Sequence, residues 1–188
     1  MTRTHPQTAP YPSTWTDADR TGSRSMPYLG AAIPVGLAGA ASVAIFLLVL
    51  DALAGAPLAT PNMLGAALFR GESLTSAAAI QPGLVFGYTL LHGAAFLVVA
   101  AAAVSAEYTL SSRGVPIRLQ LVFGVLGLFG GLQAMFMLVA LLLGLSWETL
   151  GIERIAVANA IAAVVMAFVV SLRRRVREDP LHPEGASR

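Results

Sequence analysis

Four long apolar stretches, separated by short polar ones, set the pattern of this chain. They cover residues 29–54, 83–106, 117–145 and 152–172, and the second of them contains no charged side chain. An α-helix rises about 1.5 Å per residue, so each stretch is long enough to cross a hydrocarbon core about 30 Å thick. The pattern therefore predicts an all-α fold, a four-helix transmembrane bundle.

The segment between the first two stretches, residues 57–81, resembles neither a span nor a plain loop. Thr60 followed by Pro61 is typical of a helix start, with Thr as the N-cap and Pro at the first helical position. Arg70 and Gly71 suit a helix end. The apolar face between these signals consists of Met63, Leu64, Ala67 and Leu68. We expect a short interfacial helix here, lying flat at the membrane surface between spans one and two.

The polar ends of the chain contrast with its apolar middle. Residues 1–27 are rich in Thr, Ser and Pro and show no helical or strand periodicity, which predicts a disordered tail. Residues 28–173 make up the four-span membrane domain, and residues 174–188 form a second tail. We expect both tails to be cytoplasmic.

The arginines give the reason for this orientation. All twelve basic residues are arginines, and all except Arg70 and Arg154 lie near the chain ends or in the connection 107–118. Basic residues are enriched on the cytoplasmic side of membrane proteins, so both termini are predicted to face the cytoplasm of a bacterial inner membrane. The cluster that ends the fourth span is expected to contact anionic lipid: Arg173, Arg174, Arg175 and Arg177.

Small residues recur every three or four positions along the spans, a pattern that lets helix backbones approach closely. Ala32, Gly36 and Ala40 mark such a face on the first span. The glycines expected to pack against neighbouring helices from the second and third spans are Gly83, Gly87, Gly124, Gly127 and Gly131.

Five polar residues within the apolar stretches are candidates for a functional site: Asp51, Tyr88, His92, Gln133 and Asn159. Asp51 lies near the end of its span, where a capping or interhelical hydrogen bond is expected ahead of an ion or proton site. His92 lies near the middle of the second span, one turn after Tyr88. Gln133 lies at a similar depth in the third span, so a His92–Gln133 hydrogen bond is the simplest prediction, with a bond from Tyr88 to a neighbour as the other.

A second interpretation makes His92 a cofactor ligand. An imidazole nitrogen can ligate the iron of haem or the magnesium of a chlorophyll-type pigment such as bacteriochlorophyll. No other span contains a histidine, so a bis-histidine haem within one chain is excluded, and Met135 is the candidate second ligand.

Composition narrows the function classes. The chain is 56% hydrophobic and 12% charged, against about 25% charged in soluble proteins. It contains no cysteine, which excludes disulfides, thiolate metal sites and cysteine nucleophiles. The sequence has no GxSxG, HExxH or Walker motif, and its net charge of +2 is too small to suggest nucleic-acid binding. We expect no catalytic activity.

The stretch PLATPNMLGAALFRG, followed by GYTLLH and then Phe96, resembles a loosely defined group of uncharacterised bacterial four-span membrane proteins. The resemblance covers about residues 30–170. It implies four spans and a helix between the first two, and it implies no activity.

The sequence favours a non-catalytic accessory or structural subunit of a larger inner-membrane complex, with a respiratory or photosynthetic host possible. Its expected partners are larger membrane subunits. The alternatives are a haem- or pigment-binding protein that uses His92 and, ranked lowest, a small transporter or channel, because His92 is the only ionisable group deep in a span.

Overall fold

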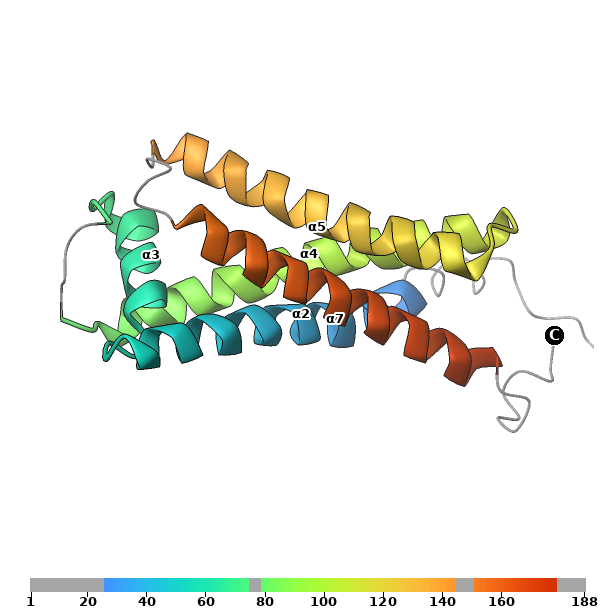
Figure 1. Ribbon diagram of the computed structural model, residues 1–188, viewed down its shortest axis with the longest axis horizontal. Coiled ribbons are helices and arrows are strands. Elements are labelled where there is room, and N and C mark those ends of the chain that lie inside the picture. Colours follow the sequence, from blue (N-terminus) through green and yellow to red (C-terminus); the bar gives the residue numbers. More distant parts are fainter. Residues whose placement is uncertain (1–25, 75–78, 145–150, 179–188) are drawn as a thin grey trace, which may run out of the picture.

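The computed structural model describes residues 26–74, 79–144 and 151–178, and all regular structure within these ranges is helical (Figure 1). Four long helices run along the molecule: α2 (Met26–Leu53), α4 (Pro82–Ser112), α5 (Ile117–Leu142) and α7 (Ile152–Glu178). Each contains a segment long and apolar enough to cross a membrane. The prediction of an all-α protein with four membrane-spanning helices is confirmed.

Two of the long helices continue past the ends predicted for their spans. Helix α4 reaches Ser112 instead of residue 106, and α7 reaches Glu178 instead of residue 172. Glu107, Arg173 and Arg174 therefore lie on helices that project beyond the apolar segments. The predicted disorder of the first tail falls, for residues 1–25, outside the described residues.

Helix α3 (Ala59–Arg70) lies across one end of the bundle, transverse to the long helices (Figure 1). The prediction of Thr60 as its N-cap is wrong: the helix begins at Ala59, and Leu58 precedes it in the left-handed conformation, with φ 69°. The predicted end is confirmed. Gly71 closes the helix with φ 67°, and its backbone N–H donates to the carbonyl of Ala67. We call this end of the bundle the α3 end. The opposite end, where Arg173 and Arg174 lie, is called the arginine end.

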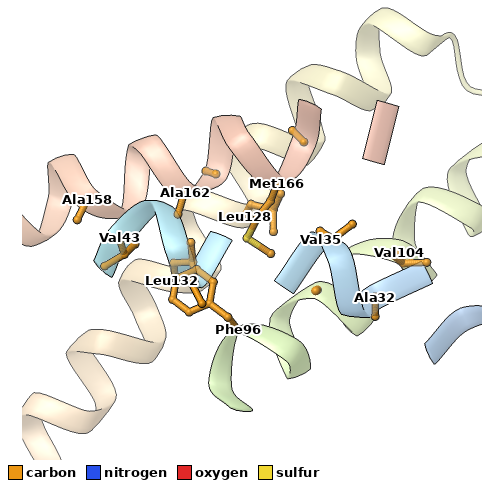
Figure 2. Close-up of a cluster of buried hydrophobic side chains, with 14 of the residues drawn as sticks. Ala32, Val35, Val43, Phe96, Val104, Leu128, Leu132, Ala158, Ala162 and Met166 are labelled. Carbon is orange, nitrogen blue, oxygen red and sulfur yellow. The ribbon is translucent and has the colours of Figure 1, made fainter. Parts of the chain in front are cut away.

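The core lies between α2, α4 and α7, with α5 adding side chains from one side (Figure 2). Val35, Ala162 and Met166 are completely buried there, and Phe96 and Leu132 are nearly so. The predicted small face on α2 is part of this core, since Ala32 and Ala40 are buried.

Two glycines of α2 show how closely its neighbours approach. A Cβ placed on Gly36 would lie 3.0 Å from the Cα of Leu97 on α4, and one on Gly39 would lie 2.5 Å from the sulfur of Met166 on α7. Real Cβ contacts are longer, so α2 can pack against both helices only because these positions lack a side chain.

The predicted glycine seam on α5 does not pack closely against the other described helices. A Cβ at Gly124, Gly127 or Gly131 would meet no atom within 4 Å in the part of the chain that the structure describes. The buried stripe instead runs through Leu128 and Leu132, one residue further along and thus rotated by about 100° around the helix. Leu128 and Leu132 fill the core beside α7, whereas the glycines line a groove between α4, α5 and α7.

Of the two glycines in the GxxxG pair on α4, one lies close to a neighbouring described helix and the other does not. A Cβ on Gly87 would lie 3.0 Å from the ring of Phe69 on α3, whereas one on Gly83 would meet no atom within 4 Å. The closest approach to α3 comes from its own glycine, because a Cβ on Gly65 would lie 2.6 Å from the backbone oxygen of Leu84. Helix α3 therefore packs closely against α4.

Candidate functional site

An aromatic column on α4 forms the centre of the candidate site. Tyr88, His92 and Phe96 follow one another at four-residue spacing, so their side chains lie on the same face of the helix. The Tyr88 and His92 rings are stacked, with centroids 5.7 Å apart and planes inclined by 26°. The His92 and Phe96 rings lie 4.8 Å apart at 50°. His92 is thus held between two aromatic neighbours.

The imidazole of His92 contacts the backbone of α2. Its Nε2 lies 3.4 Å from the carbonyl oxygen of Ala40. A carbonyl can only accept a hydrogen bond, so a neutral His92 carries its proton on Nε2 in this contact and keeps the lone pair of Nδ1 free. No hydrogen bond to Nδ1 is formed among the described residues.

The predicted His92–Gln133 hydrogen bond is wrong. Gln133 on α5 instead accepts a hydrogen bond from the Nδ2 of Asn159 on α7, at 2.9 Å. Asn159 is buried, and this bond satisfies two amides between neighbouring spans. The sequence predicts both residues as intramembrane polar groups. The depth of a residue within its span, however, does not determine which residue of another helix lies beside it.

A cavity of about 330 Å³, which we call the central cavity, adjoins this column. Most of its lining is apolar, from α3, α4, α5 and α7, with smaller contributions from α2. Its polar lining residues are Thr60, Tyr88, His92, Arg154 and Asn159. Apolar walls with a few polar groups are typical of sites for small molecules.

Tyr88 and His92 also line a smaller cavity of about 180 Å³ between α2 and α4. The two side chains therefore line both cavities. The predicted hydrogen bond from Tyr88 to a neighbour is not formed either, since its hydroxyl has no partner within the described part of the chain. Since no fully buried side-chain oxygen there lacks a partner, this hydroxyl must be accessible at the surface of a cavity or of the protein.

Asp51 has a structural role. It is buried at the end of α2, and its carboxylate accepts hydrogen bonds from the backbone N–H of Thr60 at 2.7 Å and from the Thr60 hydroxyl at 2.6 Å. It thereby satisfies a backbone donor in the first turn of α3. The prediction of a capping bond for Asp51 is confirmed, and Thr60 is the capped residue and not the cap.

Pro34 explains a contact at the arginine end. A proline inside a helix has no N–H for the carbonyl four residues earlier, so the Gly30 carbonyl lacks its usual helical partner. Arg173 of α7 donates to this carbonyl at 3.2 Å and to the Ala31 carbonyl at 3.0 Å. A residue predicted as a lipid contact thus also ties α7 to α2.

Arg174 lies beside a groove between α4, α5 and α7. Its guanidinium donates to the side chain of Gln120 at 2.8 Å and lies 3.9 Å from the carboxylate of Glu107. The groove has a volume of about 410 Å³, and it is lined on the α5 side by Gly124, Gly127 and Gly131. The side chains of Arg175 and Arg177 are outside the described residues.

The residues that the cofactor hypothesis needs share one site, because His92 and Met135 both line the central cavity. The described part of the chain holds no group of three or more His, Cys, Asp or Glu side chains that could bind a metal ion. Ligation of a haem or bacteriochlorophyll by His92 therefore stays a prediction.

No protein-family model, curated protein or solved structure matches this chain. The resemblance to uncharacterised bacterial four-span proteins is thus untested.

Proposed function

We propose that this protein is a non-catalytic accessory or structural subunit of a larger complex in the bacterial inner membrane, with both termini in the cytoplasm. The observation that carries this proposal is the contrast between its two small-residue faces. The face on α2 packs against α4 and α7, whereas a Cβ on any glycine of the α5 seam, Gly124, Gly127 or Gly131, would meet no atom of the described residues within 4 Å.

Helix association in a bilayer depends on close packing, because lipid tails are as apolar as leucine and no hydrophobic force drives helices together. A seam that is free of side chains lets a second backbone come close and gain those contacts. The surface of α5 on either side of the seam is also apolar and exposed, as at Leu121 and Phe123. A span of a larger membrane subunit is therefore the proposed occupant of this seam.

The arginine end supports the proposed orientation. The side chain of Arg174 is about one-quarter exposed, and Arg113 after α4 and Arg118 in the first turn of α5 are exposed as well. Basic groups at one end of a bundle suit a cytoplasmic surface with anionic lipid.

Binding of haem or a chlorophyll-type pigment ranks second. His92 and Met135 line one cavity, but both rings beside His92 contact it and its Nε2 faces the Ala40 carbonyl. A transporter or channel ranks third, because the deep polar residues Gln133 and Asn159 bond to each other and are uncharged.

Purification of a tagged chain from its native membranes tests the accessory role. We expect larger membrane subunits to co-purify, and expect Gly131→Leu to reduce their amount severalfold because the added side chain blocks the seam. Ala94→Leu adds the same bulk at another exposed position and should leave co-purification unchanged.

Two further variants separate the alternatives. Removal of residues 1–25 should also reduce co-purification if this segment docks on the host complex, while His92→Gln should leave any visible absorption band unchanged. Undiminished co-purification in both Gly131→Leu and the truncation would contradict the accessory role. A band that disappears in His92→Gln would favour the pigment-binding alternative.

A further inference from the structure

We infer that the central cavity binds a neutral, lipid-soluble ring compound that carries hydroxyl groups, a molecule of the quinol class. This goes beyond the accessory role. The glycine seam and the central cavity are lined by different residues, so either proposal can fail without the other.

The hydrogen-bonding groups around the cavity define what a ligand must offer. With Nε2 directed at the Ala40 carbonyl, the neutral imidazole of His92 presents Nδ1 as an acceptor. The Tyr88 hydroxyl, which has no partner within the described ranges, can donate one hydrogen bond and accept others. A ligand that serves both groups must bring a hydroxyl as well as an oxygen that accepts.

The oxidation state of the ligand follows from the same geometry. A quinone has only carbonyl oxygens, which can accept from Tyr88 but cannot donate to the Nδ1 of His92. A quinol has hydroxyls that can do both. Because most residues that line the cavity are apolar, an unpaired nitrogen lone pair there is costly, and the hydroxyl-bearing form should bind better.

The shape and charge of the cavity fit such a ring. Phe96 and Leu132 form apolar walls, and the volume of about 330 Å³ suits a single ring with the start of a tail. Arg154 is the one charged residue among the described lining residues, and it lies on the first turn of α7, toward the α3 end. A neutral ring can therefore approach His92 without placing a charge deep in the bundle.

A titration of the full-length protein in detergent with decylbenzoquinol, kept reduced under anaerobic conditions, tests this inference by calorimetry. The dimethyl ether of the same compound is the matched ligand, since it keeps the ring and tail and loses both donors. We expect the wild-type protein to bind the quinol about tenfold more tightly than the ether, the effect of about one hydrogen bond in an apolar site.

Variants assign the effect to the cavity. His92→Phe keeps an aromatic ring between Tyr88 and Phe96 but should abolish the preference for quinol over ether. Tyr88→Phe removes one hydroxyl and should weaken quinol binding about tenfold. Ala95→Leu fills the cavity and should abolish binding, whereas Ala102→Leu, which lines the separate groove beside α5, should bind as the wild-type protein does.

Equal affinity of the wild-type protein for quinol and ether would overturn the inference without recourse to any variant. Unchanged binding in Ala95→Leu would place the ligand elsewhere and overturn it as well. A visible absorption band in the purified protein that His92→Gln removes would assign the cavity to a pigment and exclude a quinol.

Discussion

Single residues at the ends of the long helices hold the connections in place. Asp51 bonds twice to Thr60 and so links the end of α2 to the start of α3. Leu58, between them, adopts a left-handed conformation that costs a residue with a side chain about 1 kcal/mol. The two hydrogen bonds offset this cost, which explains how α3 can begin so soon after α2 ends.

The Asp51 contact gives a prediction at this scale. Asp51→Ala removes both acceptors and should lower the free energy of unfolding by about 1 kcal/mol, as loss of a helix cap does. Asp51→Asn retains one acceptor and should cost less. Thermal unfolding in detergent measures both changes.

A matched control is available on the same side of the bundle. Among the described residues, the Glu72 side chain forms one exposed ion pair, with Arg70 at 3.5 Å, so Glu72→Gln should leave the unfolding temperature unchanged. If Asp51→Ala were as stable as Glu72→Gln, the capping role of Asp51 would be refuted.

Much of the candidate site could not be predicted from residue types, because the decisive contacts involve backbone atoms. His92 was identified as a central group from its depth in an apolar stretch. Its partner is the carbonyl of Ala40, and every residue in α2 has such a carbonyl, so the sequence carries no signal for this choice. Tyr88 and Phe96 could be placed beside it, since a spacing of four residues suffices.

At the scale of helices, the spans were predictable and their facing sides were only partly so. Length and apolar character determine where α2, α4, α5 and α7 lie in the sequence. The rotation of each helix about its own axis depends on how its side chains pack into the spaces that the neighbouring helices leave. On α2 the small face is the packed one, but on α5 the leucines pack inward and the glycines do not. A pattern of small residues predicts that another helix can approach closely. It does not predict which helix does so.

This difference predicts opposite results for two equivalent substitutions. Gly36→Leu places a side chain against the backbone of Leu97 and should destabilise the isolated protein by about 1–3 kcal/mol or prevent its folding. A Cβ on Gly127 would meet no atom of the described residues within 4 Å, and the groove beside it has room for the rest of a leucine, so Gly127→Leu should leave the stability of the isolated protein unchanged.

Unfolding in detergent, with the protein purified away from other subunits, distinguishes the two variants. Gly39→Ala serves as a milder check on the α2 face, since even one methyl group there would overlap Met166. A stable Gly36→Leu variant, or a strongly destabilised Gly127→Leu variant, would contradict the packing described for these helices.

At the scale of the whole molecule, the start of α2 and the end of α7 lie at the same end of the bundle, and α3 lies at the other (Figure 1). Four antiparallel spans require this arrangement. The side of the membrane that each end faces is the proposal made from the arginines.

Reporter fusions test that proposal directly. Alkaline phosphatase fused at Arg70 should be active, because the enzyme folds only after export, and the same enzyme fused after Arg188 should be inactive. A cytoplasmic reporter at the two positions should give the reverse result and serves as the control. Phosphatase activity at the C-terminus would contradict the proposed orientation.

Because α2 packs directly against α7, the core cannot close until the ribosome has made the last span. Helices α2 and α4 can pair as soon as both have left the translocon, since Gly36 fits against Leu97. Helix α5 then enters the bilayer before α7, the helix beside which its leucines are buried. During synthesis the chain must therefore pass through a three-span intermediate with lipid at the place later taken by Met166. Codon usage and pausing along residues 145–178 would set how long membrane proteases and insertases have access to that intermediate.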